Sequence, residues 1–210
     1  MMGIRAVVFD FGKVICFPPS EENRRTLSAM TGLSGETLTE LERKFRNEYD
    51  RGAFDGKSYY RTLLEDRGIF LDDSLLAKIA ETDAEGWKRI DSGTVALMRD
   101  VKKLGFALGI LSNMPHDFLA WARKSIPVFG ETDAAVFSCE VNSVKPERRI
   151  YEKLRESLGC GFSEIVFFDD LPDNVEQAGK LGIHGILWNG SEAARRDLEK
   201  IDRRFRFVPD

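Results

Sequence analysis

The chain has 210 residues, of which 42% are hydrophobic, and its 31 basic and 35 acidic residues give a formal net charge of −4. This composition predicts a folded protein made of one domain with an insert, or of two small domains. Acidic and basic residues are mixed along the chain, so no basic tract indicates a nucleic-acid partner. Three widely spaced cysteines and two histidines are too few for a zinc site or a disulfide framework. We expect reduced thiols in a cytoplasmic protein.

The apolar segments of the chain are strand-sized, far shorter than the roughly 20 residues that a membrane-spanning helix needs. Asp10 and Lys13 interrupt the apolar N-terminal segment, and no small-residue cleavage site follows it. This pattern argues against a signal peptide. We therefore expect no membrane partner.

The first predicted element is a buried strand over residues 4–9, IRAVVF, which is short, apolar and rich in β-branched residues. Between about residues 18 and 88, apolar residues recur at spacings of three and four, and glycines separate the segments. This pattern is typical of about four consecutive helices without strands.

From residue 92 onward, helical and strand patterns alternate. Helices are predicted over residues 92–105, 117–126, 147–159, 172–182 and 191–200, and strands over 106–111, 134–139, 164–168 and 184–188. Such alternation indicates right-handed crossovers and a parallel sheet with helices on both faces. The expected fold is an α/β, Rossmann-like, doubly wound parallel sheet with an inserted helical cap domain. Residues 1–16 and 90–210 are expected to form the core domain, and residues 17–89 the four-helix cap.

Polar side chains follow the predicted strands at the edge where parallel α/β sheets bind ligands, namely the carboxyl ends of the strands. In chain order these residues are Asp10, Ser112, Asn113, Lys145, Asp169 and Asp170. Each alone is typical of a turn or a helix start. Together they bring three carboxylates, an ammonium group and a hydroxyl to one edge.

The chemistry of this group of residues fits a metal ion and a phosphate. Neighbouring carboxylates repel one another unless a cation lies between them, and hard oxygen ligands of this kind suit Mg²⁺. Lys145 and Ser112 suit the outer oxygens of a phosphate. A carboxylate such as Asp10 can attack phosphorus and form an aspartyl-phosphate.

Four segments of the chain resemble the four motifs of the haloacid dehalogenase (HAD) superfamily of hydrolases. They are VVFDFGKV, ILSN, SVKPERRIY and VFFDDLPDNVEQAGKLG, and the resemblance covers essentially the whole chain. The inserted helical block resembles the small helical cap that closes over the site in one subclass. The resemblance implies an enzyme whose catalytic residues are Asp10, the nucleophile, and Lys145.

The resemblance also implies the ligands of the metal and of the phosphate. The Mg²⁺ ligands would be Asp10, the backbone carbonyl of Gly12, and Asp170, with Asp169 beside Asp170 or one layer further out. The phosphoryl group would be held by Ser112, the backbone of Asn113, and Lys145.

The sequence departs from the family pattern at Gly12. Most phosphatases of this family carry an aspartate at this position, two residues after the nucleophile, where it protonates the leaving oxygen. General acid–base help is typically worth ~10²–10⁴-fold, so its loss slows a reaction without abolishing it. A leaving group that departs easily, such as the anomeric oxygen of a sugar phosphate, depends on this help least.

A subgroup that includes bacterial glucose-1-phosphate phosphatases is similar in having glycine at this position and an FFDD segment. We therefore favour Mg²⁺-dependent hydrolysis of a small phosphorylated metabolite, with a sugar phosphate as the favoured substrate. The expected oligomeric state is a monomer or a weak homodimer.

Two alternatives stay open. A metal-independent 2-haloacid dehalogenase also uses an aspartate nucleophile without the second acid, although the pair Asp169 and Asp170 argues against it. A non-catalytic member would bind a phosphorylated ligand without cleaving it. Three further residues are candidates to contact the substrate: Asp50 and Arg51 from the cap, and His116 as a substitute acid after the second motif.

Overall fold

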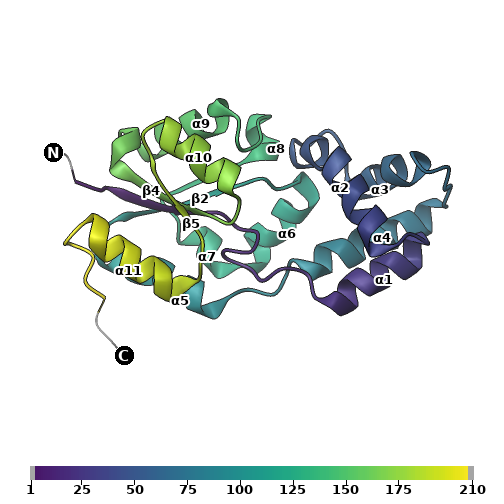
Figure 1. Ribbon diagram of the computed structural model, residues 1–210, viewed down its shortest axis with the longest axis horizontal. Coiled ribbons are helices and arrows are strands. Elements are labelled where there is room, and N and C mark those ends of the chain that lie inside the picture. The colour runs from purple at the N-terminus through teal and green to yellow at the C-terminus, as the bar shows by residue number, and fades with distance from the viewer. Residues whose placement is uncertain (1–2, 208–210) are drawn as a thin grey trace.

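The computed structural model describes residues 3–207, and its centre is a five-stranded parallel sheet (Figure 1). The strands lie in the order β3-β2-β1-β4-β5. Their bounds are Ala6–Phe9 for β1, Ala107–Ser112 for β2, Ala134–Phe137 for β3, Ile165–Asp169 for β4 and His184–Leu187 for β5. β1 pairs with both β2 and β4, so it occupies the middle of the sheet. The predicted α/β fold with a doubly wound parallel sheet is confirmed.

Helices cover both faces of the sheet, because successive residues of the central strand point to opposite sides. Val7 and Phe9 of β1 belong to one apolar cluster, whereas Ala6 and Val8 belong to another. The first cluster packs under α5 (Ser92–Lys103), α6 (His116–Ser125), α7 (Pro127–Gly130) and α11 (Ser191–Ile201). The second packs under α9 (Arg148–Leu158) and α10 (Pro172–Lys180), on the upper side in Figure 1.

The other four long helices form a helical insert at one end of the molecule, on the right in Figure 1. They are α1 (Glu21–Thr31), α2 (Gly35–Asp50), α3 (Gly56–Glu65) and α4 (Asp73–Gly86). They pack around an apolar cluster of their own. Each helix begins at a residue whose side chain accepts a hydrogen bond from the backbone N–H three residues on: Ser20, Ser34, Asp55 and Asp72. The exact limits of core and cap, residues 16/17 and 89/90, stay a prediction.

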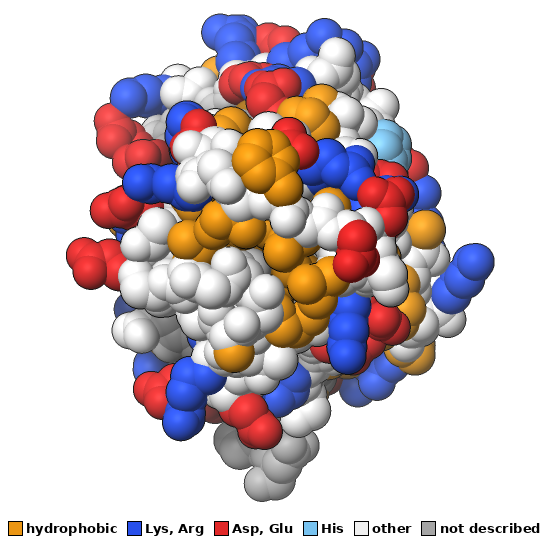
Figure 2. All heavy atoms as spheres, turned by 90° about the vertical axis from the view of Figure 1, so that its right-hand side faces the viewer, with side chains coloured by type: hydrophobic (Ala, Val, Ile, Leu, Met, Phe, Trp, Pro, Cys, Tyr) orange, Lys and Arg blue, Asp and Glu red, His pale blue; other side chains and the backbone are white. Residues whose placement is uncertain are grey.

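Figure 2 shows the end of the molecule that these helices form. Apolar side chains gather in the middle of this face, and basic and acidic side chains surround them. No helix within residues 3–207 combines the length and the apolar character that crossing a membrane requires.

The predicted strand over residues 134–139 is wrong at its end. β3 stops at Phe137, and Ser138–Val141 form the single-turn helix α8. The Ser138 hydroxyl accepts a hydrogen bond from Met114 N at 2.8 Å and donates one to the carbonyl of Asp50, at the end of α2. This turn therefore joins the sheet edge to the helical insert.

Candidate active site

The carboxyl ends of three neighbouring strands bring three of the predicted site residues together. Asp10 directly follows β1, Ser112 ends β2 and Asp169 ends β4. The backbone N–H of Asp10 donates to Phe168 O at 2.9 Å, so the ladder between β1 and β4 holds the start of the loop in place. All three side chains are buried.

Lys145 lies between two of these carboxylates. Its Nζ atom is 2.7 Å from Asp10 Oδ1 and 2.6 Å from Asp169 Oδ2, and its side chain is only 1% exposed. Burial is the largest single effect and lowers the pKa of Lys145, but the charges and hydrogen bonds of Asp10 and Asp169 together outweigh it, so the pKa is raised. The ammonium group therefore stays charged although it is buried.

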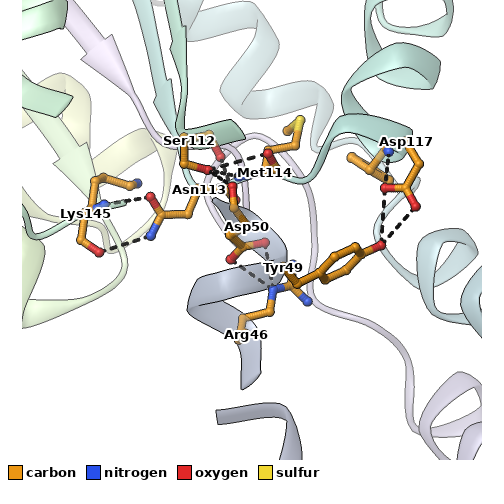
Figure 3. A network of polar contacts seen from close by, with 10 residues as sticks. Arg46, Tyr49, Asp50, Ser112, Asn113, Met114, Asp117 and Lys145 are labelled. Carbon is orange, nitrogen blue, oxygen red and sulfur yellow. Dashed lines mark hydrogen bonds and ion pairs between the residues drawn. The ribbon is translucent and has the colours of Figure 1, made fainter. Parts of the chain in front are cut away.

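The position of Lys145 depends on Asn113. The side-chain amide of Asn113 accepts a hydrogen bond from Lys145 N at 2.7 Å and donates one to Lys145 O at 3.1 Å. Figure 3 shows this pair beside Ser112. The segment after α8 is thereby fixed to the end of β2.

The two buried carboxylates differ in how their hydrogen bonds are satisfied. Asp169 Oδ1 accepts from Leu171 N and Asn174 Nδ2, both at 2.9 Å, and its Oδ2 accepts from Lys145. Asp10 Oδ1 has a single side-chain partner among the described residues, the ammonium group of Lys145 at 2.7 Å. Burial raises the pKa of Asp10 to about 7, with Lys145 partly offsetting this effect.

Asp170 completes an acidic cluster. One oxygen from each of Asp10, Asp169 and Asp170 lies within 4.8 Å of the others. Lys13 Nζ is 3.1 Å from Asp170 Oδ2, and the Lys13 side chain is 48% exposed. Three carboxylates against two lysines leave a formal charge of −1, and this set of hard oxygen atoms fits Mg²⁺.

A cavity of about 570 Å³ lies between this edge of the sheet and the helical insert. The predicted site residues that line it are Asp10, Gly12, Asp50, Ser112, Asn113, Lys145 and Asp170. A side chain at Gly12 would project toward the indole ring of Trp87, since a Cβ atom there would be 3.5 Å from Trp87 Cζ3. The ring of Trp87 thus lies beside Gly12, the position at which most phosphatases of the family that the sequence resembles carry a second aspartate.

The three candidates outside the motifs have different surroundings. Asp50 is buried and lines the cavity, where Arg46 Nε donates to its two oxygens at 2.9 and 3.0 Å (Figure 3). Arg51 instead makes two hydrogen bonds to the carboxylate of Glu147, at 3.0 and 2.7 Å.

His116 is exposed and packs against Gly52, where an added Cβ would come within 2.8 Å of its Nε2. Neither Arg51 nor His116 is among the residues that line the cavity. Both lie instead where the loop after α2 meets the core.

Sequence reasoning did not single out Arg46, Asp83 or Trp87, which also line the cavity. One signal was present in the sequence. Asp83 follows Leu76 and Ile79 at helical spacing, so an acid occupies the apolar face of α4. A carboxylate on such a face is buried, which is costly without a partner.

Comparison with known proteins agrees with this geometry. Residues 4–182 match the family model of the haloacid dehalogenase-like hydrolases. The chain belongs to this family. Among curated relatives, the chain is 26% identical to a phosphatase of Mycobacterium tuberculosis over 218 residues, which cover 95% of the chain and 96% of the relative. It is 27% identical to the (S)-2-haloacid dehalogenase 4A of Burkholderia cepacia over 202 residues, covering 89% and 83% of the two proteins.

The chain is also 27% identical to the pig bifunctional epoxide hydrolase 2, over 95% of its own length but only 39% of that relative. The chain therefore spans less than half of this longer protein. Among solved structures, a HAD family enzyme of Bacteroides thetaiotaomicron superposes with a TM-score of 0.75 at 19% identity, covering 94% of the chain and 99% of that structure. This likeness shows the shared fold.

Proposed function

We propose that this hydrolase is a Mg²⁺-dependent phosphatase that cleaves a small phosphate monoester through an aspartyl-phosphate on Asp10. One observation carries the proposal. The buried carboxylate of Asp10 lines the cavity, and its Oδ1 atom lies 2.7 Å from the charged amine of Lys145. Such a carboxylate is placed to act as a nucleophile.

The residues present suit a magnesium ion. Asp10, Asp170 and the carbonyl of Gly12 would hold it, whereas Asp169 holds Lys145, because both of its oxygens already accept hydrogen bonds. Bound Mg²⁺ supplies positive charge that offsets the surplus of carboxylates and polarises the phosphoryl group.

The chain's own groups then divide the reaction into two steps. An oxygen of Asp10 attacks phosphorus, the ester P–O bond breaks, and the electron pair leaves on the substrate oxygen, which takes up a proton from solvent after it departs. Water then attacks the phosphorus of the aspartyl-phosphate and gives up a proton to solvent, the bond to Asp10 breaks, and inorganic phosphate leaves. Lys145, Ser112 and the backbone N–H of Asn113 are assigned to hold the phosphoryl oxygens throughout.

The surroundings of Gly12 support a sugar phosphate as the substrate. The ring of Trp87 cannot donate a proton to the leaving oxygen as a carboxylic acid does, so a leaving group that departs without protonation is favoured. The anomeric oxygen of a sugar phosphate fits, as in the glucose-1-phosphate phosphatase subgroup that the sequence resembles. We expect a cytoplasmic enzyme that acts on a small phosphorylated metabolite as a monomer or weak homodimer.

The comparisons support a phosphatase without deciding its substrate. The Mycobacterium tuberculosis relative, of which 96% is aligned with 95% of the chain, is named a phosphatase. A further structure of the Bacteroides thetaiotaomicron enzyme, with a TM-score of 0.69 at 20% identity, contains magnesium and inorganic phosphate. The Burkholderia cepacia relative keeps a 2-haloacid dehalogenase as the second candidate.

A panel of phosphate esters, with Mg²⁺ or with a chelator, tests the proposal. We expect phosphate release from at least one sugar phosphate with Mg²⁺, and none with the chelator. Asp10→Asn keeps the shape of the side chain but removes the nucleophile, so turnover should fall by about a thousandfold or more while the far-UV circular dichroism is unchanged. Chloride release from a 2-haloacid without metal would establish the dehalogenase instead. Binding of phosphate esters without any turnover would establish the non-catalytic alternative.

A further inference from the structure

The wall of the cavity that the helical insert forms carries three acidic side chains, and two of them have basic partners. Glu42 accepts a hydrogen bond from Arg24 at 2.8 Å, and Asp50 accepts from Arg46. Asp83, on α4, has no basic nitrogen within ion-pair distance anywhere in residues 3–207. Asp83 is therefore the acidic side chain of this wall that lacks a basic partner within residues 3–207.

Asp83 is a buried carboxylate that faces the cavity. It is only 7% exposed and lines the cavity. Burial raises the pKa of Asp83, and the attraction of Arg46 offsets only part of this effect. The hydroxyl of Tyr60 is a near neighbour and also helps to lower the pKa of Asp83. Buried polar groups are nearly always hydrogen-bonded, so Asp83 is placed to accept hydrogen bonds from a bound molecule.

Arg46 offers complementary donors on the same wall. Its Nε is bound to Asp50, while no residue of the described chain accepts a hydrogen bond from its two terminal amino groups. The rings of Tyr49 and Trp87 lie 5.6 and 6.0 Å from its Cζ atom. Figure 3 shows Arg46 and Asp50 reaching from α2 toward the sheet edge. The guanidinium is thus held in one orientation with its free donors available to a ligand.

The combination of Asp83 and Arg46 selects among ligand chemistries. A hydroxyl group can donate to Asp83 and accept from Arg46. An ammonium group would be attracted by Asp83 but repelled by Arg46. A carboxylate or a second phosphate would find the charge of Arg46 already offset by Asp50. Such an anion would also be repelled by the carboxylates of Asp50 and Asp83. A neutral group with several hydroxyls can donate to Asp83 and accept from Arg46 without charge repulsion.

We propose that Arg46 and Asp83 form a hydroxyl-binding subsite that recognises the leaving alcohol of the substrate as a neutral polyhydroxylated group, with Asp50 as the residue that positions Arg46. The inference rests on the proposed phosphatase function. It goes beyond that function by proposing that Arg46 and Asp83 bind the alcohol part of the substrate, which lies away from the phosphate. An enzyme with this subsite discriminates against esters that lack hydroxyls, because Asp83 is then left unpaired.

Two phosphate esters with the same carbon ring test the subsite. myo-Inositol 1-phosphate carries ring hydroxyls, and cyclohexyl phosphate carries none. We expect kcat/KM of the unmodified enzyme to be at least about tenfold higher for the inositol ester, the size expected for one lost charge-assisted hydrogen bond. Esters of 4-aminocyclohexanol and 4-hydroxycyclohexanecarboxylate represent the ammonium and carboxylate alternatives. Preference for either one over the inositol ester would overturn the inference.

Variants of Asp83 and Arg46 test whether these two residues cause the preference for the inositol ester over cyclohexyl phosphate. Asp83→Asn keeps the shape and Arg46→Lys keeps the charge beside Asp50, so both variants are expected to fold. Each should reduce the preference to less than about threefold by lowering kcat/KM for the inositol ester, with little change for cyclohexyl phosphate. Glu81→Gln on α4 and Lys44→Gln on α2 are matched controls with exposed side chains, and their preference should equal that of the unmodified enzyme.

The outcomes separate this inference from the proposed function. An equal loss of kcat/KM for both esters in Asp83→Asn and Arg46→Lys means that the two residues serve only the structure, and overturns the subsite. If neither these esters nor any sugar phosphate is hydrolysed, the phosphatase proposal fails, and calorimetry with Asp10→Asn then decides the subsite alone. Tighter binding of the inositol ester, lost in Asp10→Asn/Asp83→Asn, supports it. Equal affinity for the two esters overturns it.

Discussion

The side-chain amide of Asn113 binds both backbone polar groups of Lys145, accepting from its N–H at 2.7 Å and donating to its carbonyl at 3.1 Å. One side chain at the end of β2 therefore fixes the position of the lysine, although 32 residues separate the two in sequence. Lys145 in turn contacts the carboxylates of Asp10 and Asp169. The geometry of the site thus depends on a residue that touches neither carboxylate.

Replacing this amide is expected to reduce both stability and activity. Asn113→Ala removes two hydrogen bonds, each with a net contribution of about 1 kcal/mol, so the free energy of unfolding should fall by about 2 kcal/mol. Turnover should fall as well, because Lys145 loses its fixed position. Urea denaturation and steady-state kinetics measure the two effects. An Asn113→Ala protein with unchanged turnover would show that Lys145 does not depend on this support.

A small side chain at Gly12 should be tolerated. A Cβ atom there would stand 3.5 Å from Trp87 Cζ3, which is ordinary van der Waals contact. Gly12→Ala is therefore expected to change the free energy of unfolding by no more than about 0.5 kcal/mol, and turnover by less than about threefold. Thermal unfolding and kinetics check this. Loss of activity with normal stability would mean that the ligand or substrate uses the space beside the glycine.

Magnesium should stabilise the folded protein through the acidic cluster. A ligand that binds only the folded state at 100 times its Kd adds about 2.7 kcal/mol to the free energy of unfolding. We expect a rise in Tm with Mg²⁺ that is strongly reduced in Asp170→Asn, because this variant loses a carboxylate of the cluster. Glu176→Gln, also on α10 but outside the lining of the cavity, is a control that should keep the full rise. Equal shifts in all three proteins would place the ion elsewhere.

The ion pair between Arg51 and Glu147 should make a pH-dependent contribution to stability. Hydrogen bonds from Arg51 hold the pKa of Glu147 at about 2, below its ordinary value of 4.5. Because the folded-state pKa is lowered, the contribution is fully present above pH 4.5 and is lost as the pH falls toward 2. The Glu147 side chain is 43% exposed, so solvent screening limits the contribution to no more than about 1 kcal/mol.

Comparison of the unmodified protein with Glu147→Gln measures this effect. The difference in Tm should be constant between pH 6 and 7 and should shrink below pH 4.5. Arg51→Ala should weaken the same pH dependence, because the hydrogen bonds from Arg51 are the largest cause of the lowered pKa of Glu147. A difference in Tm that does not vary with pH would show that Glu147 stabilises the protein by packing alone.

Much of the fold followed from periodicity. Alternating helical and strand patterns after residue 92 predicted a parallel sheet, and the observed bounds agree within a few residues, apart from the end of β3 at Phe137. The sheet edge was predictable for the same reason, because parallel strands joined by right-handed crossovers present their carboxyl ends together. Asp10, Ser112 and Asp169 therefore had to meet once the strands paired.

Residues of the helical insert could not be placed in this way. Arg51 and Asp50 are adjacent in sequence, yet one pairs with Glu147 on the core and the other lines the cavity. Arg46 and Asp83 lie on different helices and share a wall only because α2 and α4 pack in one bundle. Helical spacing indicates which residues share a face, but it does not determine which partner that face meets.

The sequence by itself determined the α/β fold, the helical insert and the group of polar residues at the ends of the strands, because these depend on local periodicity and on the geometry of parallel crossovers. The tertiary structure decided which carboxylates are free and which are paired. Asp169 is saturated by three donors, whereas Asp10 and Asp83 line the cavity, Asp10 with Lys145 as its partner and Asp83 without an ion-pair partner among residues 3–207. The physical reason is that hydrogen-bond satisfaction depends on contacts between distant segments, which only packing creates.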